Sequence, residues 1–167
     1  MGEFTTTPIG ISPVEIHDDR GGYVDDYEKA VRLYNNDGRQ VKILGMCRSA
    51  CLLALGARNV CVGKNAVVMA HMSYERGTGI IRPDVTYRML GQLPDKIRVR
   101  LNGRIRREYG DAATLKYKQL VRLGIRDCAV AEQVPLPPRR FPFVLEAREE
   151  IPWPVKFSAR VAMQVAA

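Results

Sequence analysis

The sequence predicts an α/β fold in which strands and helices alternate around a mostly parallel sheet. Short β-branched, apolar runs are separated by segments with helical spacing of apolar residues, and glycine-bearing polar turns lie between them. The chain has 167 residues, of which 46% are hydrophobic and 26% charged, a composition typical of one globular domain with its own core. Strands that alternate with helices favour parallel pairing through right-handed crossovers.

The first half of the chain contains the most regular of these units. A glycine-bearing turn over 18–22 separates the first strand from the first helix, and a tight turn at Ser49 separates the second strand from a second helix. In chain order we expect a strand over 13–17, a helix over 23–34, a strand over 41–44, a helix over 50–55, and strands near 59–62 and 66–70.

The second half is predicted to be mainly helical. An exposed loop over 75–83 leads into further elements, and Gly124 is a plausible left-handed cap. The expected helices span 84–93, 94–109 and 113–123. Ile97, Leu101 and Ile105 share one face of the middle helix, and we expect that face to contact a partner. Residues 1–133 are interpreted as the core and 134–167 as a proline-rich extension.

The chain is basic, with a formal net charge of +8. The excess is concentrated in 98–100, 104–107 and 139–140, without the interleaved aromatic residues that favour RNA binding, so we interpret it as solvated surface and expect no nucleic-acid partner. No stretch approaches the roughly 18 to 20 apolar residues of a membrane span, and no secretory signal is visible. The chain as written is expected in the cytoplasm, or in the periplasm if its N-terminus is truncated.

The four cysteines are too few and too irregularly spaced for a disulfide scaffold, and they lack the paired spacing of a zinc site. We therefore expect buried thiols, no metal and no cofactor. In an oxidising compartment the preferred pair is Cys51 with Cys61, because the helix after Ser49 is expected to pack against the next strand.

Ser49 and His71 are the strongest candidates for chemistry. Ser49 lies where an apolar strand turns into an Ala- and Leu-rich helix, a position that holds a hydroxyl beside free backbone amides. His71 ends the apolar run 67–70, twenty-two residues later. His17, the other histidine, has no identifiable partner and is interpreted as structural.

Four signals in order resemble one family. They are Gly21-Gly22 after a strand, Ser49-Ala50 at a strand–helix turn, His71 at a strand end, and Leu-Gly-Ile-Arg-Asp over 123–127. Together they resemble the proteolytic subunit of the Clp protease and its ClpP-like relatives in the crotonase superfamily. Family members usually carry another strand–helix unit before the Gly-Gly strand, so the resemblance is to an N-terminally short member.

The resemblance implies a ClpP/crotonase-like spiral and a serine peptidase site. It makes Ser49 the nucleophile and His71 the general base, with the amides of Gly22 and Ala50 as the oxyanion hole. Asp111 lies near the position of the family's third catalytic residue. The resemblance also implies a peptide or unfolded-protein substrate, a homo-oligomer and an ATPase unfoldase partner. Cysteines that flank the Ser-Ala pair resemble small bacterial ClpP-like proteins found outside the cytoplasm.

Each of these residues also has a structural interpretation. A serine at such a turn often caps a helix, a histidine on an apolar strand is often a core residue, and Asp111 fits a capping or solvated carboxylate. The alternative functions are a non-catalytic scaffold or binding module with the same fold, and an acyl-thioester enzyme that uses the two amides without a serine nucleophile.

Overall fold

The computed structural model describes residues 12–108, 110 and 113–131, and it shows a mixed α/β fold with a curled, mostly parallel sheet. The expected extension over 134–167 and Asp111 lie outside the described residues. The elements are β1 (Val14–Asp19), α1 (Val24–Asp37), β2 (Val41–Arg48), the 3₁₀ helix η1 (Ser49–Gly56), β3 (Val60–Val62), β4 (Val67–Met69), α2 (Pro83–Gly91), α3 (Asp95–Leu101), β5 (Thr114–Lys116), α4 (Tyr117–Arg122), β6 (Arg126–Asp127) and α5 (Cys128–Ala131). The predicted alternation of strands and helices is therefore confirmed at this coarse level.

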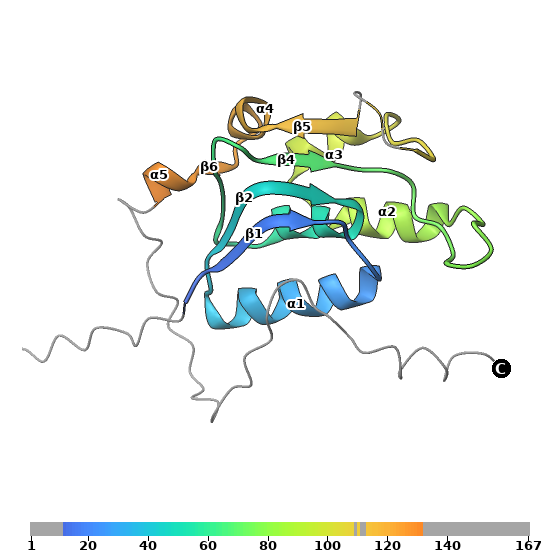
Figure 1. Ribbon diagram of the computed structural model, residues 1–167, viewed down its shortest axis with the longest axis horizontal. Coiled ribbons are helices and arrows are strands. Elements are labelled where there is room, and N and C mark those ends of the chain that lie inside the picture. Colours follow the sequence, from blue (N-terminus) through green and yellow to red (C-terminus); the bar gives the residue numbers. More distant parts are fainter. Residues whose placement is uncertain (1–11, 109, 111–112, 132–167) are drawn as a thin grey trace, which may run out of the picture.

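Strand β2 is the centre of the sheet. It pairs in parallel with β1 on one side, and on the other side with β3 along its first half and β4 along its second half. Strand β6 adds to β3 in parallel, and β5 adds to β4 in the antiparallel sense. Because β1, β2 and β4 run the same way, their carboxyl ends meet at one edge, on the right in Figure 1.

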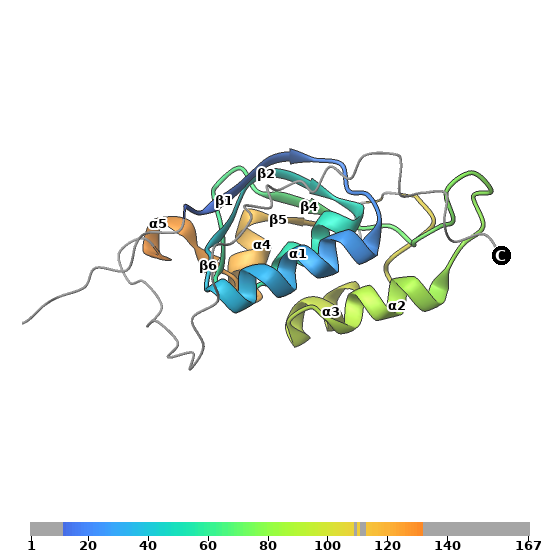
Figure 2. The ribbon, with the colours of Figure 1, turned by 90° about the horizontal axis from the view of Figure 1, so that it is seen from below.

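One side of the curled sheet is covered by helices (Figure 2). In β1 the buried Val14 and Ile16 alternate with the exposed Glu15 and His17, as expected for a strand with one covered face. The covering helix α1 buries residues at helical spacing, among them Tyr27, Ala30, Val31 and Tyr34. No helix in the described part of the chain is long and apolar enough to cross a membrane.

Three predicted elements differ from those observed. The segment predicted as a helix over 113–123 begins as strand β5, because the Leu115 backbone pairs with Val68 of β4 and this pairing overrides local helical preference. The helix predicted to reach residue 109 ends at Leu101, shortly before Gly103 adopts a left-handed φ of 70°. The segment after Ser49 is a 3₁₀ helix.

The apolar side chains of α3 and of the turn after it are buried within the chain itself. Ile97 and Leu101 are completely buried, and Ile105 is also buried in the same core cluster. The expectation that these side chains mediate self-association is therefore wrong. They are part of the chain's own core, where removing apolar area from water stabilises the fold.

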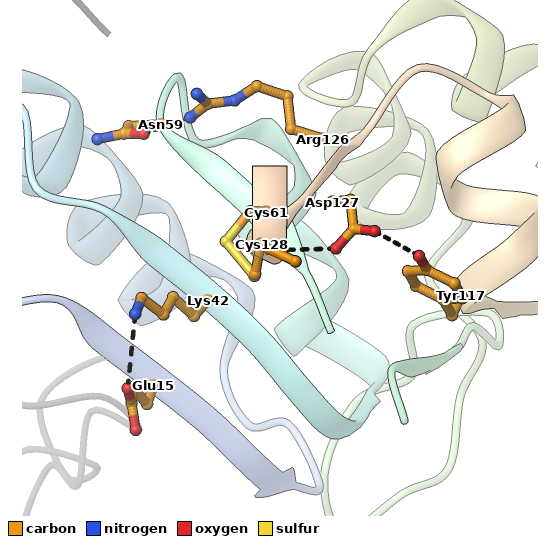
Figure 3. Close-up of a disulfide and its surroundings, with 9 residues drawn as sticks. Glu15, Lys42, Asn59, Cys61, Tyr117, Arg126, Asp127 and Cys128 are labelled. Atoms are coloured by element: carbon orange, nitrogen blue, oxygen red, sulfur yellow. Dashed lines mark hydrogen bonds and ion pairs between the residues drawn. A yellow bond between two sulfur atoms is a disulfide. The ribbon is translucent and has the colours of Figure 1, made fainter. Parts of the chain in front are cut away.

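The four cysteines form two disulfides, Cys47–Cys51 and Cys61–Cys128. The expectations of buried thiols and of a Cys51–Cys61 pair are both wrong. Register explains the second bond: Cys61 is paired with Arg126 in the β3–β6 ladder, which brings Cys128 to the end of that ladder. Figure 3 shows this disulfide between β3 and α5.

A short polar network fixes the chain beside Cys128. Asp127 accepts a hydrogen bond from the Tyr117 hydroxyl at 2.5 Å and one from the Ala129 amide at 3.0 Å (Figure 3). The hydrogen bond from Tyr117 holds the pKa of the Asp127 carboxyl below its ordinary value. The C-terminal part of the described core is thus attached by the β3–β6 ladder, a disulfide and the hydrogen-bonded carboxylate of Asp127.

Candidate functional site

The carboxyl ends of β1, β2 and β4 bring the predicted site residues together. Asp19 of β1 lies opposite Cys47 of β2, and Arg48 of β2 lies opposite Met69 of β4. The residues that follow these pairs therefore emerge at the same edge. Gly21, Gly22, Ser49 and His71 all line one cavity of about 450 Å³.

A second cavity, of about 490 Å³, lies elsewhere in the molecule between η1, the α2–α3 junction and β6. Its lining is mainly apolar, with Leu93 and Ile125, and its charged side chains are Arg58 and Arg126. Its lining includes no serine, histidine, cysteine or carboxylate among the residues that the structure describes. The chemistry-bearing groups are thus in the cavity at the carboxyl edge.

Ser49 occupies an unusual backbone conformation. Its φ is 54°, and it is the one non-glycine residue with positive φ in the described part of the chain. A serine in the left-handed region costs on the order of 1 kcal/mol, and such strain persists only where the surroundings hold it. Here the Cys47–Cys51 disulfide closes the turn around Ser49, so the serine is fixed at the start of η1.

Gly21 packs directly against the Ser49 turn. A Cβ at Gly21 would lie 2.7 Å from the Ser49 Cβ and 2.6 Å from the carbonyl oxygen of Arg48, and Gly21 has a φ of 82°. No other residue fits this position without displacing backbone. The close approach belongs to Gly21, whereas Gly22 faces the Tyr27 ring.

A buried carboxylate that sequence reasoning missed holds the Gly-Gly turn. Asp19 is 3% exposed, and its Oδ1 accepts hydrogen bonds at 2.7 Å from the Gly21 amide and at 2.7 Å from the Tyr27 hydroxyl. Its other oxygen is buried without a hydrogen-bond partner among the described residues. The sequence signal was an aspartate two residues before a glycine, the pattern of an Asx turn.

His71 is oriented by a backbone carbonyl. It is 7% exposed, and its Nδ1 lies 2.8 Å from the Met72 carbonyl oxygen. Because a carbonyl only accepts, the neutral ring carries its proton on Nδ1 and leaves Nε2 as the basic nitrogen. Burial lowers the pKa of His71 below its ordinary 6.5, an effect larger than the opposing one of the Met72 hydrogen bond.

The two amides predicted to form the oxyanion hole, those of Ala50 and Gly22, belong to segments next to the Ser49 turn. Ala50 is in the first turn of η1, where amides have no acceptor within the helix. Its nitrogen would lie 2.9 Å from a Cβ at Gly21, so the Gly-Gly turn and the start of η1 are in contact. Gly22 lies between β1 and α1 and belongs to neither element. Gly22 lines the cavity, and Ala50 directly follows Ser49, which also lines it.

The structure does not describe Asp111, the predicted third residue. The described part of the chain supplies the Met72 carbonyl at His71 Nδ1 instead of a carboxylate. The neighbouring Ala113 carbonyl accepts a hydrogen bond from the Ala70 amide at 3.0 Å. The expectation that His17 lacks a partner is wrong, since its exposed ring lies 3.3 Å from Glu15 Oε2.

Within residues 12–108, 110 and 113–131, no cluster of three or more His, Cys, Asp or Glu side chains is arranged to hold a metal ion. The arrangement instead brings a serine in a left-handed backbone conformation, a buried imidazole and the Gly21-Gly22 turn to one cavity. A scan against protein-family models finds no match, and a search of curated proteins finds no significant relative.

Proposed function

We propose that this chain is a ClpP-like serine peptidase, in which Ser49 is the nucleophile and His71 the general base. The observation that carries the proposal is the convergence of Gly21-Gly22, Ser49 and His71 at the carboxyl ends of three adjacent parallel strands. The left-handed turn at Ser49 and the Nδ1-protonated state of His71 support it, because a nucleophile and its base need fixed positions.

In the proposed first step, Ser49 Oγ attacks the carbonyl carbon of the scissile peptide bond while His71 Nε2 takes the hydroxyl proton. The carbonyl oxygen becomes an oxyanion, and the amides of Gly22 and Ala50 are the proposed donors to it. Two preorganised donors of this kind are each worth about 3 kcal/mol in the transition state. The Asp19 carboxylate does not contact the substrate in this step; it positions the Gly-Gly turn by accepting the hydrogen bond from the Gly21 amide.

The intermediate collapses when the carbon–nitrogen bond breaks and imidazolium Nε2 returns the proton to the leaving amine. An ester between Ser49 and the acyl group remains. Water then attacks this ester, His71 again takes and returns the proton, and a carboxylic acid leaves with the serine restored. Throughout, the Met72 carbonyl accepts the hydrogen bond from His71 Nδ1, so that Nε2 remains the nitrogen that takes and returns the proton.

The ClpP/crotonase-like spiral, self-association and an ATPase unfoldase partner remain parts of the proposal. The curled parallel sheet is compatible with the spiral at the level of fold class. The buried face of α3 gives self-association no support, but Tyr87 and Val99 on α2 and α3 are more than half exposed. A mass above the 18.8 kDa of one chain in light scattering is the expected result.

The two disulfides favour an oxidising compartment over the cytoplasm. Disulfides form and persist in extracellular and periplasmic proteins, whereas cytoplasmic thiols are kept reduced. One of the two closes the Ser49 turn, so the proposed nucleophile is best held under oxidising conditions. We therefore prefer the periplasmic alternative.

A non-catalytic scaffold is the second candidate, and one observation favours it. His71 Nδ1 contacts a backbone carbonyl, which orients the ring but stabilises the imidazolium less than a carboxylate does. If the protein is an active peptidase and Asp111 stabilises the imidazolium, Asp111→Ala is expected to lower the rate of Ser49 labelling by orders of magnitude.

An alkyl fluorophosphonate tests the proposed function, since it reacts with activated serines and needs no knowledge of the substrate. We expect one adduct per folded chain, on Ser49, and none in Ser49→Ala. Ser73→Ala is the matched control, because Ser73 lines the same cavity and its amide is bound to Thr86. Unlabelled, folded protein with intact disulfides contradicts the peptidase and leaves the scaffold.

A further inference from the structure

Among the residues that the structure describes, those lining the cavity at Ser49 include more cationic than anionic side chains. Its charged lining consists of Arg20, Arg76, Arg82, Arg88, Asp25 and Glu75. His71 adds no charge near neutral pH, because burial lowers its pKa. A cavity with this excess attracts anionic groups, and low-dielectric walls strengthen the attraction.

Two of the four arginines are already neutralised. Arg82 donates to both carboxylate oxygens of Asp84, at 3.1 and 2.8 Å. Arg88 contacts Asp25 and also lies 3.1 Å from Glu28. Because their carboxylate partners offset their charge, Arg82 and Arg88 attract an anionic ligand only weakly.

Arg20 and Arg76 differ from that pair. Within residues 12–108, 110 and 113–131, neither takes part in an ion pair. The Arg76 guanidinium lies 5.0 Å from the centre of the Tyr23 ring, a cation–π contact that positions the charge without neutralising it. The remaining acid, Glu75, accepts a hydrogen bond from Thr78 in its own loop.

The loop that carries Arg76 is anchored at its base. Tyr74 pairs with Ile81 across the loop, and the Arg82 amide donates to the Ser73 carbonyl at 2.8 Å. The Ser73 amide in turn donates to the Thr86 hydroxyl of α2 at 2.9 Å. Arg76 therefore lines the cavity from a loop that is anchored at its base, while Arg20 lines it from the turn that carries Gly21.

We propose that the cavity selects substrates in which the residue that supplies the reacting carbonyl has an acidic side chain, aspartyl or glutamyl. Arg20 and Arg76 bind that carboxylate, and the exposed rings of Tyr23 and Tyr74 contact its carbon stem. This inference rests on the proposed function, because it concerns the specificity of the Ser49 site.

Two phosphonate probes that differ only in one side chain test the preference. One carries a glutamyl side chain beside the phosphorus and the other its neutral glutaminyl isostere. Intact-mass measurement gives the rate of Ser49 phosphonylation by each at about 50 mM salt. We expect the acidic probe to react about tenfold faster, since two partly exposed charge pairs act together.

Charge variants and salt identify the source of the preference. Arg20→Gln and Arg76→Gln are each expected to lower the rate ratio about threefold, whereas Arg122→Gln on α4 changes the net charge equally and leaves the ratio alone. Raising the salt of the unmodified protein to about 500 mM shrinks the ratio through screening, and this arm needs no variant to fold.

The probes also separate failure of the specificity from failure of the site. If the alkyl fluorophosphonate labels Ser49 but the two side-chain probes react equally, the acidic preference is overturned and the peptidase stands. A ratio that persists in both arginine variants overturns it as well. If the folded protein reacts with none of the probes, the proposed function is overturned and the specificity with it.

Discussion

The disulfides Cys47–Cys51 and Cys61–Cys128 lie at opposite ends of β2 and close loops of very different length. Cys61 is paired with Lys42 near the start of β2, whereas Cys47 is near its end. The first bond spans 4 positions and the second 67. The short one encloses Ser49, and the long one attaches α5 to the sheet beside the hydrogen-bonded Asp127 (Figure 3).

Loop length separates what the two bonds contribute. In the chain-entropy account, a cross-link over 67 positions stabilises the fold by about 4 kcal/mol and one over 4 positions by about 2 kcal/mol. The long bond therefore mainly opposes unfolding. The short bond mainly fixes the left-handed turn at Ser49, where small displacements change reactivity.

The largest expected effect comes from removing the long disulfide. Cys61→Ala together with Cys128→Ala is expected to lower the free energy of unfolding by about 4 kcal/mol. Denaturant unfolding measures the loss, and phosphonylation of Ser49 below the transition is expected to stay within about twofold. A large fall in labelling with unchanged stability would reverse the assignment of the two bonds.

The second largest effect is expected from Gly21→Ala, which lowers the free energy of unfolding by about 3 kcal/mol. The causes are the positive φ at Gly21 and the collision of the new Cβ with the Arg48 carbonyl. Labelling of Ser49 is expected to disappear, because the collision is relieved only by moving that turn. Gly38→Ala is the matched control: Gly38 also has a positive φ, of 74°, but nothing lies within 4 Å of a Cβ there. Equal effects of both would contradict the close-approach argument.

Removing the short disulfide is expected to have the reverse profile of the long one. Cys47→Ala with Cys51→Ala lowers the free energy of unfolding by about 2 kcal/mol. The phosphonylation rate of Ser49 falls roughly tenfold to a hundredfold, because the strained serine turn loses its closure. Stopped-time intact-mass measurements give the rate, and unchanged labelling would show that the bond has no part in positioning Ser49.

The smallest effect is expected from weakening the hydrogen bonds of Asp19, which holds the Gly-Gly turn. Tyr27→Phe removes one of the two hydrogen bonds to Asp19 Oδ1 and is expected to cost about 1 kcal/mol and to slow labelling several-fold. Tyr34→Phe, the same change two turns later on α1, is expected to affect stability alone. Equal labelling by the two variants would remove Asp19 from the positioning of the Gly-Gly turn.

The sequence predicted the edge of the sheet better than its far end. Apolar runs before Ser49 and His71 are sufficient to place both residues after neighbouring parallel strands, because parallel strands end at a common edge. The contacts that position them were not predictable in the same way. The Met72 carbonyl is backbone, and the Asp19 contacts depend on how α1 packs.

At the far end, long-range pairing decided what local pattern could not. Cys61 meets Cys128 because β6 joins β3, and two-residue strands such as Arg126–Asp127 carry no periodic signal. Leu115 looked helical, but it was taken into β5 by pairing with β4. The end of α3 did have a signal in Asn102-Gly103, where a left-handed glycine follows the last turn.

The pH dependence of Ser49 phosphonylation tests the central claim most directly, because it examines the nucleophile and its base together. Peptide mapping is expected to place one adduct on Ser49. The rate is expected to rise with pH as His71 loses its proton, with a midpoint below 6.5, since burial lowers that pKa. The disulfide-intact, folded protein would contradict the account if it gave no adduct, an adduct elsewhere, or a midpoint above 6.5.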